Sequence, residues 1–232
     1  MQESNNILCG SIIIENRKVI NFLIVLINKL YKAQGGINMK LGIFGGSFNP
    51  PHKMHLNIVE ELLKEKILDK VIIVPTGLHY SYKSNLISNE HRFNMLKIMT
   101  RNNDKIEISD FEFKDEEIHS YDTLEYYKNI YKNDTLYFVC GLDNISYIDK
   151  WYKGKYLLNN YKFLVITRNT NNLEEILNKL KDYKENIIIT NIKSNTISST
   201  FIREQLNNKN YNIEEYLDIE VINYIKENNL YI

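Results

Sequence analysis

Residues 42–55 read GIFGGSFNPPHKMH. The apolar start is typical of a buried β-strand, and the glycines that follow leave main-chain N–H groups accessible to a phosphate. A helix that begins near Lys53 would direct the positive end of its dipole at the same place. His52 and His55 are three residues apart, so both imidazoles would lie on one face of that helix, turned back toward the glycines. Together these features predict a phosphate site that has no obvious nucleophile.

Each feature of this segment has an ordinary structural explanation when it stands alone. A Gly-Gly turn is common, and a single histidine usually has a structural role. The pair His52 and His55 could also bind zinc, but no third ligand lies nearby in the sequence. The combination of glycine turn, prolines and spaced histidines is more specific than any one of them, and it favours phosphate binding.

From Lys40 onward, short apolar runs alternate with segments of helical periodicity. β-branched strands separated by helices favour a parallel sheet covered on both faces, so we expect a single Rossmann-like α/β domain over residues 39–232. In such sheets, ligands bind beyond the carboxyl ends of the strands, where the strand order reverses. The expected strands are 41–44, 71–74, 106–108, 136–140, 163–167 and 187–190. The expected helices are 55–66, 90–100, 123–131, 173–183, 199–207 and 213–228.

The bulk composition limits the partners of the chain. Among 232 residues, 29 Lys and Arg balance 29 Asp and Glu, so no net field attracts nucleic acid or an anionic membrane. The two cysteines, Cys9 and Cys140, argue against a disulfide framework or a cysteine-based metal site and fit a reducing, cytoplasmic compartment. Residues 1–38 are expected to be an N-terminal extension, whose apolar stretch Val19–Ile27 is too short to span a bilayer. A helix packed on the domain and a targeting segment are the alternatives for these residues, and a homo-oligomer is left open.

A second polar segment precedes the helix expected at 199–207. Residues 197–203 read ISSTFIR. Ser198 or Ser199 can cap that helix and so expose the N–H groups at its start. Arg203 lies one turn into the helix, where its guanidinium could reach a phosphate bound at the same end. Alone, such a segment is most often only an N-cap.

These two segments resemble the two signatures of the nucleotidyltransferase superfamily. There, a Gly-rich turn leads to [His/Thr]-x-x-His, and a later I-S-S-[ST]-x-[IV]-R segment holds the β- and γ-phosphates of ATP. The usual pattern has Asp at the position of Asn49 and Gly at that of Met54, departures that look like those in eukaryotic nicotinamide-mononucleotide adenylyltransferases. The resemblance implies that the catalytic residues are His55, His52 and Arg203. It implies ATP contacts from Phe44, Gly45, Gly46, Ser47, Phe48, Lys53, Gly141, Asp143, Ile197, Ser198, Ser199 and Thr200.

The middle of the chain resembles the bacterial nicotinate-nucleotide adenylyltransferases. The run VPTG at 74–77 with the later Lys83, Arg92 and Met95 is similar to their P-T-G…K…R-x-x-M, and GLD at 141–143 with the later Trp151-Tyr152 is similar to their G-x-D…W. The indole face of Trp151 would attract the cationic pyridinium ring of a nicotinate nucleotide by about 0.5–2 kcal/mol. We expect a structural ion pair for Arg92. The resemblance implies a mononucleotide site formed by Thr76, Lys83, Ser120, Trp151, Tyr152 and Arg168.

The segment 118–124 departs from the family pattern S-Y-T-x-[DE]-T-L. Anchored on residues 122–124, Ser120 replaces the family threonine; anchored on Ser120-Tyr121, the loop is two residues shorter. Side chains alone therefore leave the choice between the acid and the amide form of the mononucleotide open. The bacterial-like middle segments favour the acid form.

The reaction that the resemblance implies is the transfer of AMP from ATP to nicotinate mononucleotide with release of pyrophosphate, by in-line attack without a covalent intermediate. Mg²⁺ is expected to accompany ATP and to keep mostly water ligands, because no carboxylate cage is evident; Asp110 and Glu112 are interpreted as structural. The near alternatives are nicotinamide mononucleotide as the preferred acceptor and a related enzyme such as a phosphopantetheine adenylyltransferase or a cytidylyltransferase. The two motifs give less support to a nucleotide-binding regulatory module without turnover, or to a class I synthetase, which would also need an anticodon-binding domain.

Overall fold

The computed structural model describes residues 38–79, 85–167, 173–193 and 197–231. Residues Met39–Ile232 form one structural unit and Met1–Asn38 another. Residues 1–37 lie outside the described part of the chain, and so do two residues of the expected mononucleotide site, Lys83 and Arg168.

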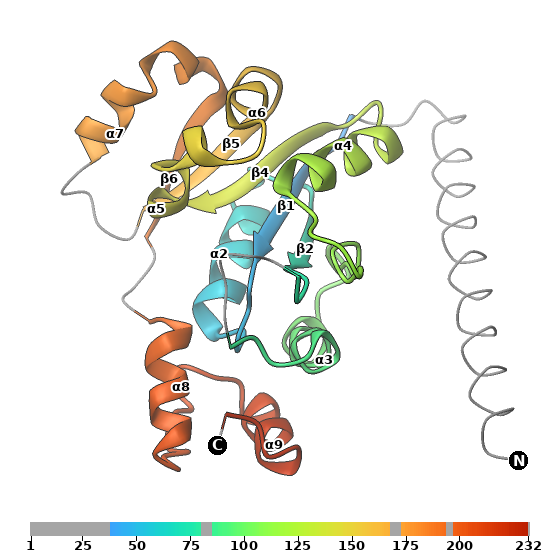
Figure 1. Cartoon of the computed structure of the whole chain (residues 1–232), viewed down its shortest axis with the longest axis vertical. Coiled ribbons are helices and arrows are strands. Elements are labelled where there is room, and N and C mark those ends of the chain that lie inside the picture. Colours follow the sequence, from blue (N-terminus) through green and yellow to red (C-terminus); the bar gives the residue numbers. More distant parts are fainter. Residues whose placement is uncertain (1–37, 80–84, 168–172, 194–196, 232) are drawn as a thin grey trace, which may run out of the picture. The chain divides into compact units, whose positions relative to one another are not determined.

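Six strands form one parallel sheet in the order β3-β2-β1-β4-β5-β6 (Figure 1). The Rossmann-like α/β fold expected from the sequence is confirmed. All six expected strands are present, and each begins or ends within three residues of its expected position. Because the strand order reverses between β1 and β4, their carboxyl ends flank the point where such sheets bind ligands. The strands are β1 (Lys40–Gly46), β2 (Lys70–Pro75), β3 (Ile106–Ile108), β4 (Thr135–Gly141), β5 (Lys162–Thr167) and β6 (Ile187–Lys193).

Six helices correspond to those expected from the sequence. They are α2 (Lys53–Lys64), α3 (Asn89–Thr100), α4 (Ser120–Ile130), α7 (Leu173–Lys179), α8 (Ser199–Asn207) and α9 (Ile219–Glu227). The helix expected at 213–228 begins only at Ile219, because the Asp218 side chain accepts a hydrogen bond from the Glu220 N–H and caps the helix there. The helix expected at 173–183 is divided into α7 and the 3₁₀ helix η2 (Lys181–Asn186).

Three short helical segments between β4 and β5 were not expected. They are α5 (Leu142–Ile145), the 3₁₀ turn η1 (Ile148–Lys150) and α6 (Gly154–Asn160). Lys153, which precedes α6, has a left-handed backbone with φ 54°. Each of these segments has only three to seven residues, and unlike α7, which η2 follows almost at once, none is extended by further helical turns into a stretch long enough to show a helical period in the sequence.

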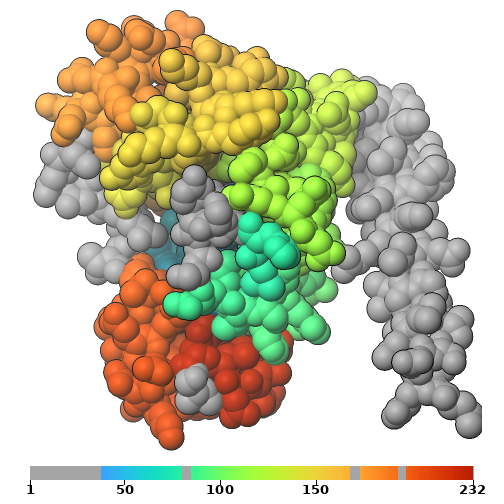
Figure 2. Space-filling view, in the orientation of Figure 1, coloured from blue at the N-terminus to red at the C-terminus, as the bar shows by residue number. Residues whose placement is uncertain are grey.

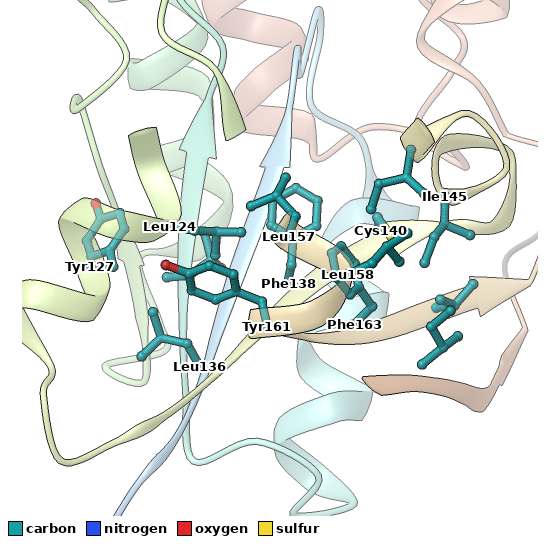
Figure 3. Close-up of a cluster of buried hydrophobic side chains, with 14 of the residues drawn as sticks. Leu124, Tyr127, Leu136, Phe138, Cys140, Ile145, Leu157, Leu158, Tyr161 and Phe163 are labelled. Atoms are coloured by element: carbon teal, nitrogen blue, oxygen red, sulfur yellow. The ribbon is translucent and has the colours of Figure 1, made fainter. Parts of the chain in front are cut away.

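Each face of the sheet has its own apolar layer. On one face, residues of β1, β4 and β5 pack against α4, α6 and α7; Figure 3 shows Phe138 and Phe163 of the sheet together with Leu124 of α4 and Leu157 of α6. On the other face, residues of β1 and β2 pack against α2 and Leu96 of α3. A third apolar cluster joins α3, α8 and α9. Through it, the last two helices are tied to the main body of the domain.

Arg92 of α3 is fully buried, and its partners differ from the ion pair expected from the sequence. Its Nη1 donates to the carbonyl of Ser47 (2.8 Å), its Nε to the carbonyl of Ile87 (3.2 Å), and its Nη2 to Oδ1 of Asn89 (2.6 Å). Burial lowers the pKa of Arg92 to about 10, which leaves it charged at neutral pH. Three neutral oxygens, from the turn after β1, the segment before α3 and the first residue of α3, thus take the place of a carboxylate partner.

We expect Arg92→Leu to lower the free energy of unfolding by about 3 kcal/mol or more, because each buried carbonyl that loses its donor costs about 1–3 kcal/mol. Urea unfolding followed by circular dichroism measures this loss. The matched control is Arg101→Leu at the end of the same helix, whose side chain is 38% exposed and pairs with Asp218 and Glu220. That change should cost less than about 1 kcal/mol; equal losses in the two variants would contradict the role given to Arg92.

None of the helices in the described part of the chain combines the length and apolar character that a membrane crossing requires.

Candidate functional site

A cavity of about 240 Å³ lies at the carboxyl ends of β1 and β4. In the space-filling view, the surface of α8 (orange-red) is separated from that of residues 142–160 (yellow) (Figure 2). The two segments that the sequence analysis assigned to one phosphate site both reach this cavity. Its lining consists of Phe44, Gly45, Gly46, Ser47, Phe48, His52, His55, Ile58, Gly141, Asp143, Asn144, Ile166, Ser198 and Ser199.

The two histidines stand at the start of α2 with their rings stacked. His52 is the N-cap residue and His55 lies in the first turn, and their ring centroids are 3.6 Å apart at an interplanar angle of 23°. The Nδ1 atom of His55 accepts a hydrogen bond from the His52 N–H at 3.2 Å. Because Nδ1 is an acceptor, the ring proton of neutral His55 is on Nε2, which makes that atom a donor. The first turn of α2 therefore holds one imidazole in a fixed tautomer.

The glycine turn and an aromatic ring fix the position of His55. The Phe48 ring meets the His55 ring edge-on with centroids 4.9 Å apart, and Phe44 lies 6.2 Å from the same ring. A Cβ atom at Gly46 would lie 3.1 Å from the Phe48 ring, closer than a side chain comfortably allows. The absence of a side chain at Gly46 thus lets Phe48 pack beneath the imidazole.

The start of α8 is bonded to the turn that follows β1. Ser198 caps α8 by accepting a hydrogen bond from the Phe201 N–H (3.2 Å). The Ser199 hydroxyl donates to the carbonyl of Pro50 at 2.9 Å. Nη1 of Arg203 donates to the carbonyl of Asn49 at 2.7 Å. Two segments about 150 residues apart in the sequence are therefore held in one fixed arrangement.

Four residues that the sequence analysis assigned to catalysis or to ATP do not line this cavity. Nη2 of Arg203 donates to Oγ1 of Thr200 (3.2 Å), and Ile197 packs against the apolar clusters. The ammonium of Lys53 donates to the carbonyl of Glu214 at 2.5 Å, in the turn before α9. Lys53 is directed there because its own N–H also bonds the neighbouring Tyr216 carbonyl at 2.9 Å.

A second cavity, of about 650 Å³, adjoins the first and shares Gly45, Gly46 and Asn144 with it. Four residues expected at the mononucleotide site line it: Thr76, Ser120, Trp151 and Tyr152. Trp151 is half-buried and meets the Phe138 ring edge-on at 5.8 Å. Glu112, which was interpreted as structural, also lines this cavity. No role was expected for the remaining lining residues, which are Ile118, His119, Thr123, Phe138, Tyr147 and Lys150.

The acidic and basic side chains of the second cavity come from the segment before α4, which carries Glu112 and His119, and from η1, which carries Lys150. Glu112 is only 8% exposed and accepts a hydrogen bond from the Thr123 hydroxyl at 2.7 Å. The His119 ring lies 4.7 Å from the ring of Tyr152. Acidic and basic groups thus share a cavity with an aromatic platform, an arrangement that suits a ring ligand with charged substituents. Adjacency to Ser120 was the one sequence signal that could have pointed to His119.

No group of three or more His, Cys, Asp or Glu side chains in the described ranges is placed to hold a metal ion. Asp143 is the one carboxylate among the residues that line the first cavity. The donor set therefore suits a cation that arrives with its own phosphate ligands better than one held by a protein cage.

Comparison with known proteins identifies the family to which this chain belongs. A family model described as cytidylyltransferase-like matches residues 43–205. A relative from Acholeplasma laidlawii, described as a probable nicotinate-nucleotide adenylyltransferase, is 40% identical over 190 residues, which cover 82% of this chain and 96% of the relative. A relative from Clostridium acetobutylicum with the same description is 36% identical over 200 residues, covering 83% and 99% of the two chains. The chain therefore belongs to the cytidylyltransferase-like family of nucleotidyltransferases.

Within that family, the nicotinate-nucleotide adenylyltransferases are the group that the chain resembles over most of its length. The solved structure of Plasmodium falciparum nicotinic acid mononucleotide adenylyltransferase complexed with NaAD has a TM-score of 0.71 at 26% identity, over 84% of this chain and 98% of that one. A second structure of that protein, complexed with APC, gives the same values.

Proposed function

We propose that this enzyme transfers the adenylyl group of ATP to nicotinate mononucleotide, giving deamido-NAD and pyrophosphate as a step of NAD biosynthesis. The relatives named for this activity, at 36–40% identity over most of both chains, support the proposal. The observation that carries it is the pair of adjoining cavities that share Gly45, Gly46 and Asn144. One cavity has phosphate-binding chemistry and the other an aromatic platform, as two substrates that meet at a phosphate require.

The triphosphate is assigned to the first cavity and the pyridine ring to the second. The N-terminal end of α2 and that of α8 both border the first cavity, and each favours bound anions through its dipole and its N–H groups. In the second cavity, the face of Trp151 attracts the cationic pyridinium ring. The shared wall at Gly45 and Gly46 is then where the mononucleotide phosphate meets the α-phosphate of ATP.

The reaction is an in-line displacement at the α-phosphorus. An oxygen of the mononucleotide phosphate forms the new bond, the bond from the α-phosphorus to the bridging oxygen breaks, and the electron pair leaves with pyrophosphate. We assign Nε2–H of His55 to the α-phosphate oxygens, where charge develops, and His52 to a flanking oxygen. Catalysis then consists of positioning and charge stabilisation, and it needs no covalent nucleophile. We assign the start of α8 to the pyrophosphate leaving group, together with Arg203, which does not itself line the first cavity but bonds the turn beside it.

Mg²⁺ enters the proposal as part of the ATP substrate. The ion neutralises charge on the triphosphate and keeps most of its ligands as water and phosphate oxygens. The single carboxylate in the first cavity, Asp143, is consistent with that. We also propose a cytoplasmic location, which the supply of ATP there and the buried free thiol of Cys140 support.

A pyrophosphate-release assay with several acceptors tests the substrate assignment. Purified protein with MgATP is given nicotinate mononucleotide, nicotinamide mononucleotide or phosphopantetheine in separate reactions. We expect the highest kcat/KM with nicotinate mononucleotide and none with phosphopantetheine. A higher kcat/KM with nicotinamide mononucleotide would make the amide the preferred acceptor. Turnover of phosphopantetheine alone would rule out the proposed function.

Replacing Trp151 by alanine tests the proposed ring platform. The KM for the mononucleotide should rise about 2- to 30-fold, which corresponds to the loss of a cation–π contact of about 0.5–2 kcal/mol. The KM for ATP should stay within about twofold, because Trp151 does not line the first cavity. Trp151→Phe keeps an aromatic face, so its KM for the mononucleotide should rise less than that of Trp151→Ala. A rise confined to the KM for ATP would contradict the placement of the ring.

A further inference from the structure

The turn between β1 and α2 carries the main-chain groups of the first cavity, but it has no regular secondary structure of its own. Phe48 in this turn has a positive φ of 47°, a conformation that side chains disfavour. Such a backbone persists only where surrounding contacts hold it in place. The contacts that do so are therefore part of the machinery that shapes the site.

The buried side chain of Asn49 is the centre of these contacts. Its Nδ2 donates to the carbonyl of Asn85 at 3.0 Å. Its Oδ1 accepts from the N–H of Ile87 at 3.4 Å and from the hydroxyl of Tyr231 at 2.9 Å. The shortest of these three contacts thus comes from a residue 182 positions further along the chain.

Tyr231 follows α9 and reaches back to the turn from the cluster that joins α3, α8 and α9. Burial raises the pKa of the Tyr231 hydroxyl, while Arg92 and Arg203 act in the opposite direction with smaller effects. With its pKa raised, the hydroxyl stays protonated at neutral pH and remains a hydrogen-bond donor. Since Arg203 bonds the Asn49 carbonyl, Tyr231 and α8 both act on the same residue of the turn.

We propose that Tyr231 is a positioning residue for catalysis: its hydroxyl holds Asn49, and through Asn49 it sets the phosphate-binding turn against the start of α8. The inference rests on the proposed function, because the positioned groups are those assigned to the triphosphate. Tyr231 lines neither cavity, so its hydroxyl acts on the substrates indirectly, through the turn that it holds.

The test compares Tyr231→Phe with Tyr224→Phe. Tyr224 is a matched control because its hydroxyl also links α9 to α3, through His91 Nδ1 (2.9 Å) and Asn94 Nδ2 (3.1 Å), without touching the turn. Both variants lose one hydroxyl and should lower the melting temperature by similar amounts. Tyr231→Phe alone should lower kcat by about three- to tenfold, the worth of one neutral hydrogen bond, with the KM for the mononucleotide within twofold.

Hydrogen exchange gives a second readout that needs no turnover. Peptides that cover residues 44–55 should exchange faster in Tyr231→Phe than in the parent protein, and at the parent rate in Tyr224→Phe. Equal kcat losses in the two variants, or unchanged exchange in this region, would overturn the inference. A parent protein that turns over no mononucleotide would defeat the proposed function, while the exchange comparison would still decide whether Tyr231 holds the turn.

Discussion

The variant His55→Ala is expected to have a kcat about 100- to 1,000-fold below that of the parent enzyme, because removing one preorganised donor to a developing oxyanion costs about 2.7–4 kcal/mol. The Nδ1 atom of His55 is engaged by the His52 N–H, which directs the ring's one donor, Nε2–H, elsewhere. We assign that donor to the α-phosphate, where charge grows only as the reaction proceeds. The dissociation constant of ATP, measured by calorimetry, should therefore change much less than kcat.

The control for this prediction is His91→Ala. His91 belongs to α3, where its ring bonds the Tyr224 hydroxyl, and it lines neither cavity. That variant should keep kcat within a few-fold of the parent. A fully active His55→Ala enzyme would contradict the assignment of the α-phosphate to this imidazole.

Arg203→Ala should lower kcat/KM for ATP by about 10- to 150-fold, because a hydrogen bond to a charged group is worth about 1.5–3 kcal/mol. Two of the five N–H donors of Arg203 bond Asn49 and Thr200, and the others can face the pyrophosphate end of ATP. The change also leaves the Asn49 carbonyl without this donor. Steady-state kinetics with varied ATP measures the effect, which should appear largely in KM for ATP.

Arg203→Lys separates charge from geometry. A lysine keeps the positive charge but cannot bond Asn49 and a phosphate with one planar group, so its kcat/KM should lie between those of Arg203→Ala and the parent. Equal activity of Arg203→Lys and the parent enzyme would show that only the charge matters. Unchanged kinetics in Arg203→Ala would contradict the assignment of Arg203 to the pyrophosphate end of ATP.

The fold could be predicted from the sequence because its long elements carry strong local signals. The strand that ends at Gly46 contains the apolar run 41–44. Helix α8 has both its Ser198 cap and a clear helical period, so its bounds were predicted as they are. The meeting of residues 44–55 with the start of α8 was predicted from the resemblance to two signatures. The short segments between Gly141 and Lys162 were missed because their helical turns are too brief to be periodic.

The parts of the site that the sequence did not indicate depend on tertiary contacts. An ion pair was expected for Arg92, but its side chain is buried against the carbonyl of Ser47, which is 45 positions earlier in the chain, and the carbonyl of Ile87 just before its own helix. Lys53 was expected at a phosphate, whereas its ammonium bonds the Glu214 carbonyl in a turn that was predicted to be helical. Tyr231 gives no local signal at all, since its partner Asn49 is near only in the folded chain.

Transfer of label from ATP tests the central claim most directly. The purified protein is incubated with Mg²⁺, nicotinate mononucleotide and ATP that is radiolabelled on the α-phosphorus, and the products are separated. We predict that the label appears in the dinucleotide, that pyrophosphate is released unlabelled, and that the protein itself takes up no label when the mononucleotide is left out. Label that stays in ATP or AMP with the mononucleotide present, or that becomes attached to the protein, would contradict direct adenylyl transfer between two substrates held in adjoining cavities.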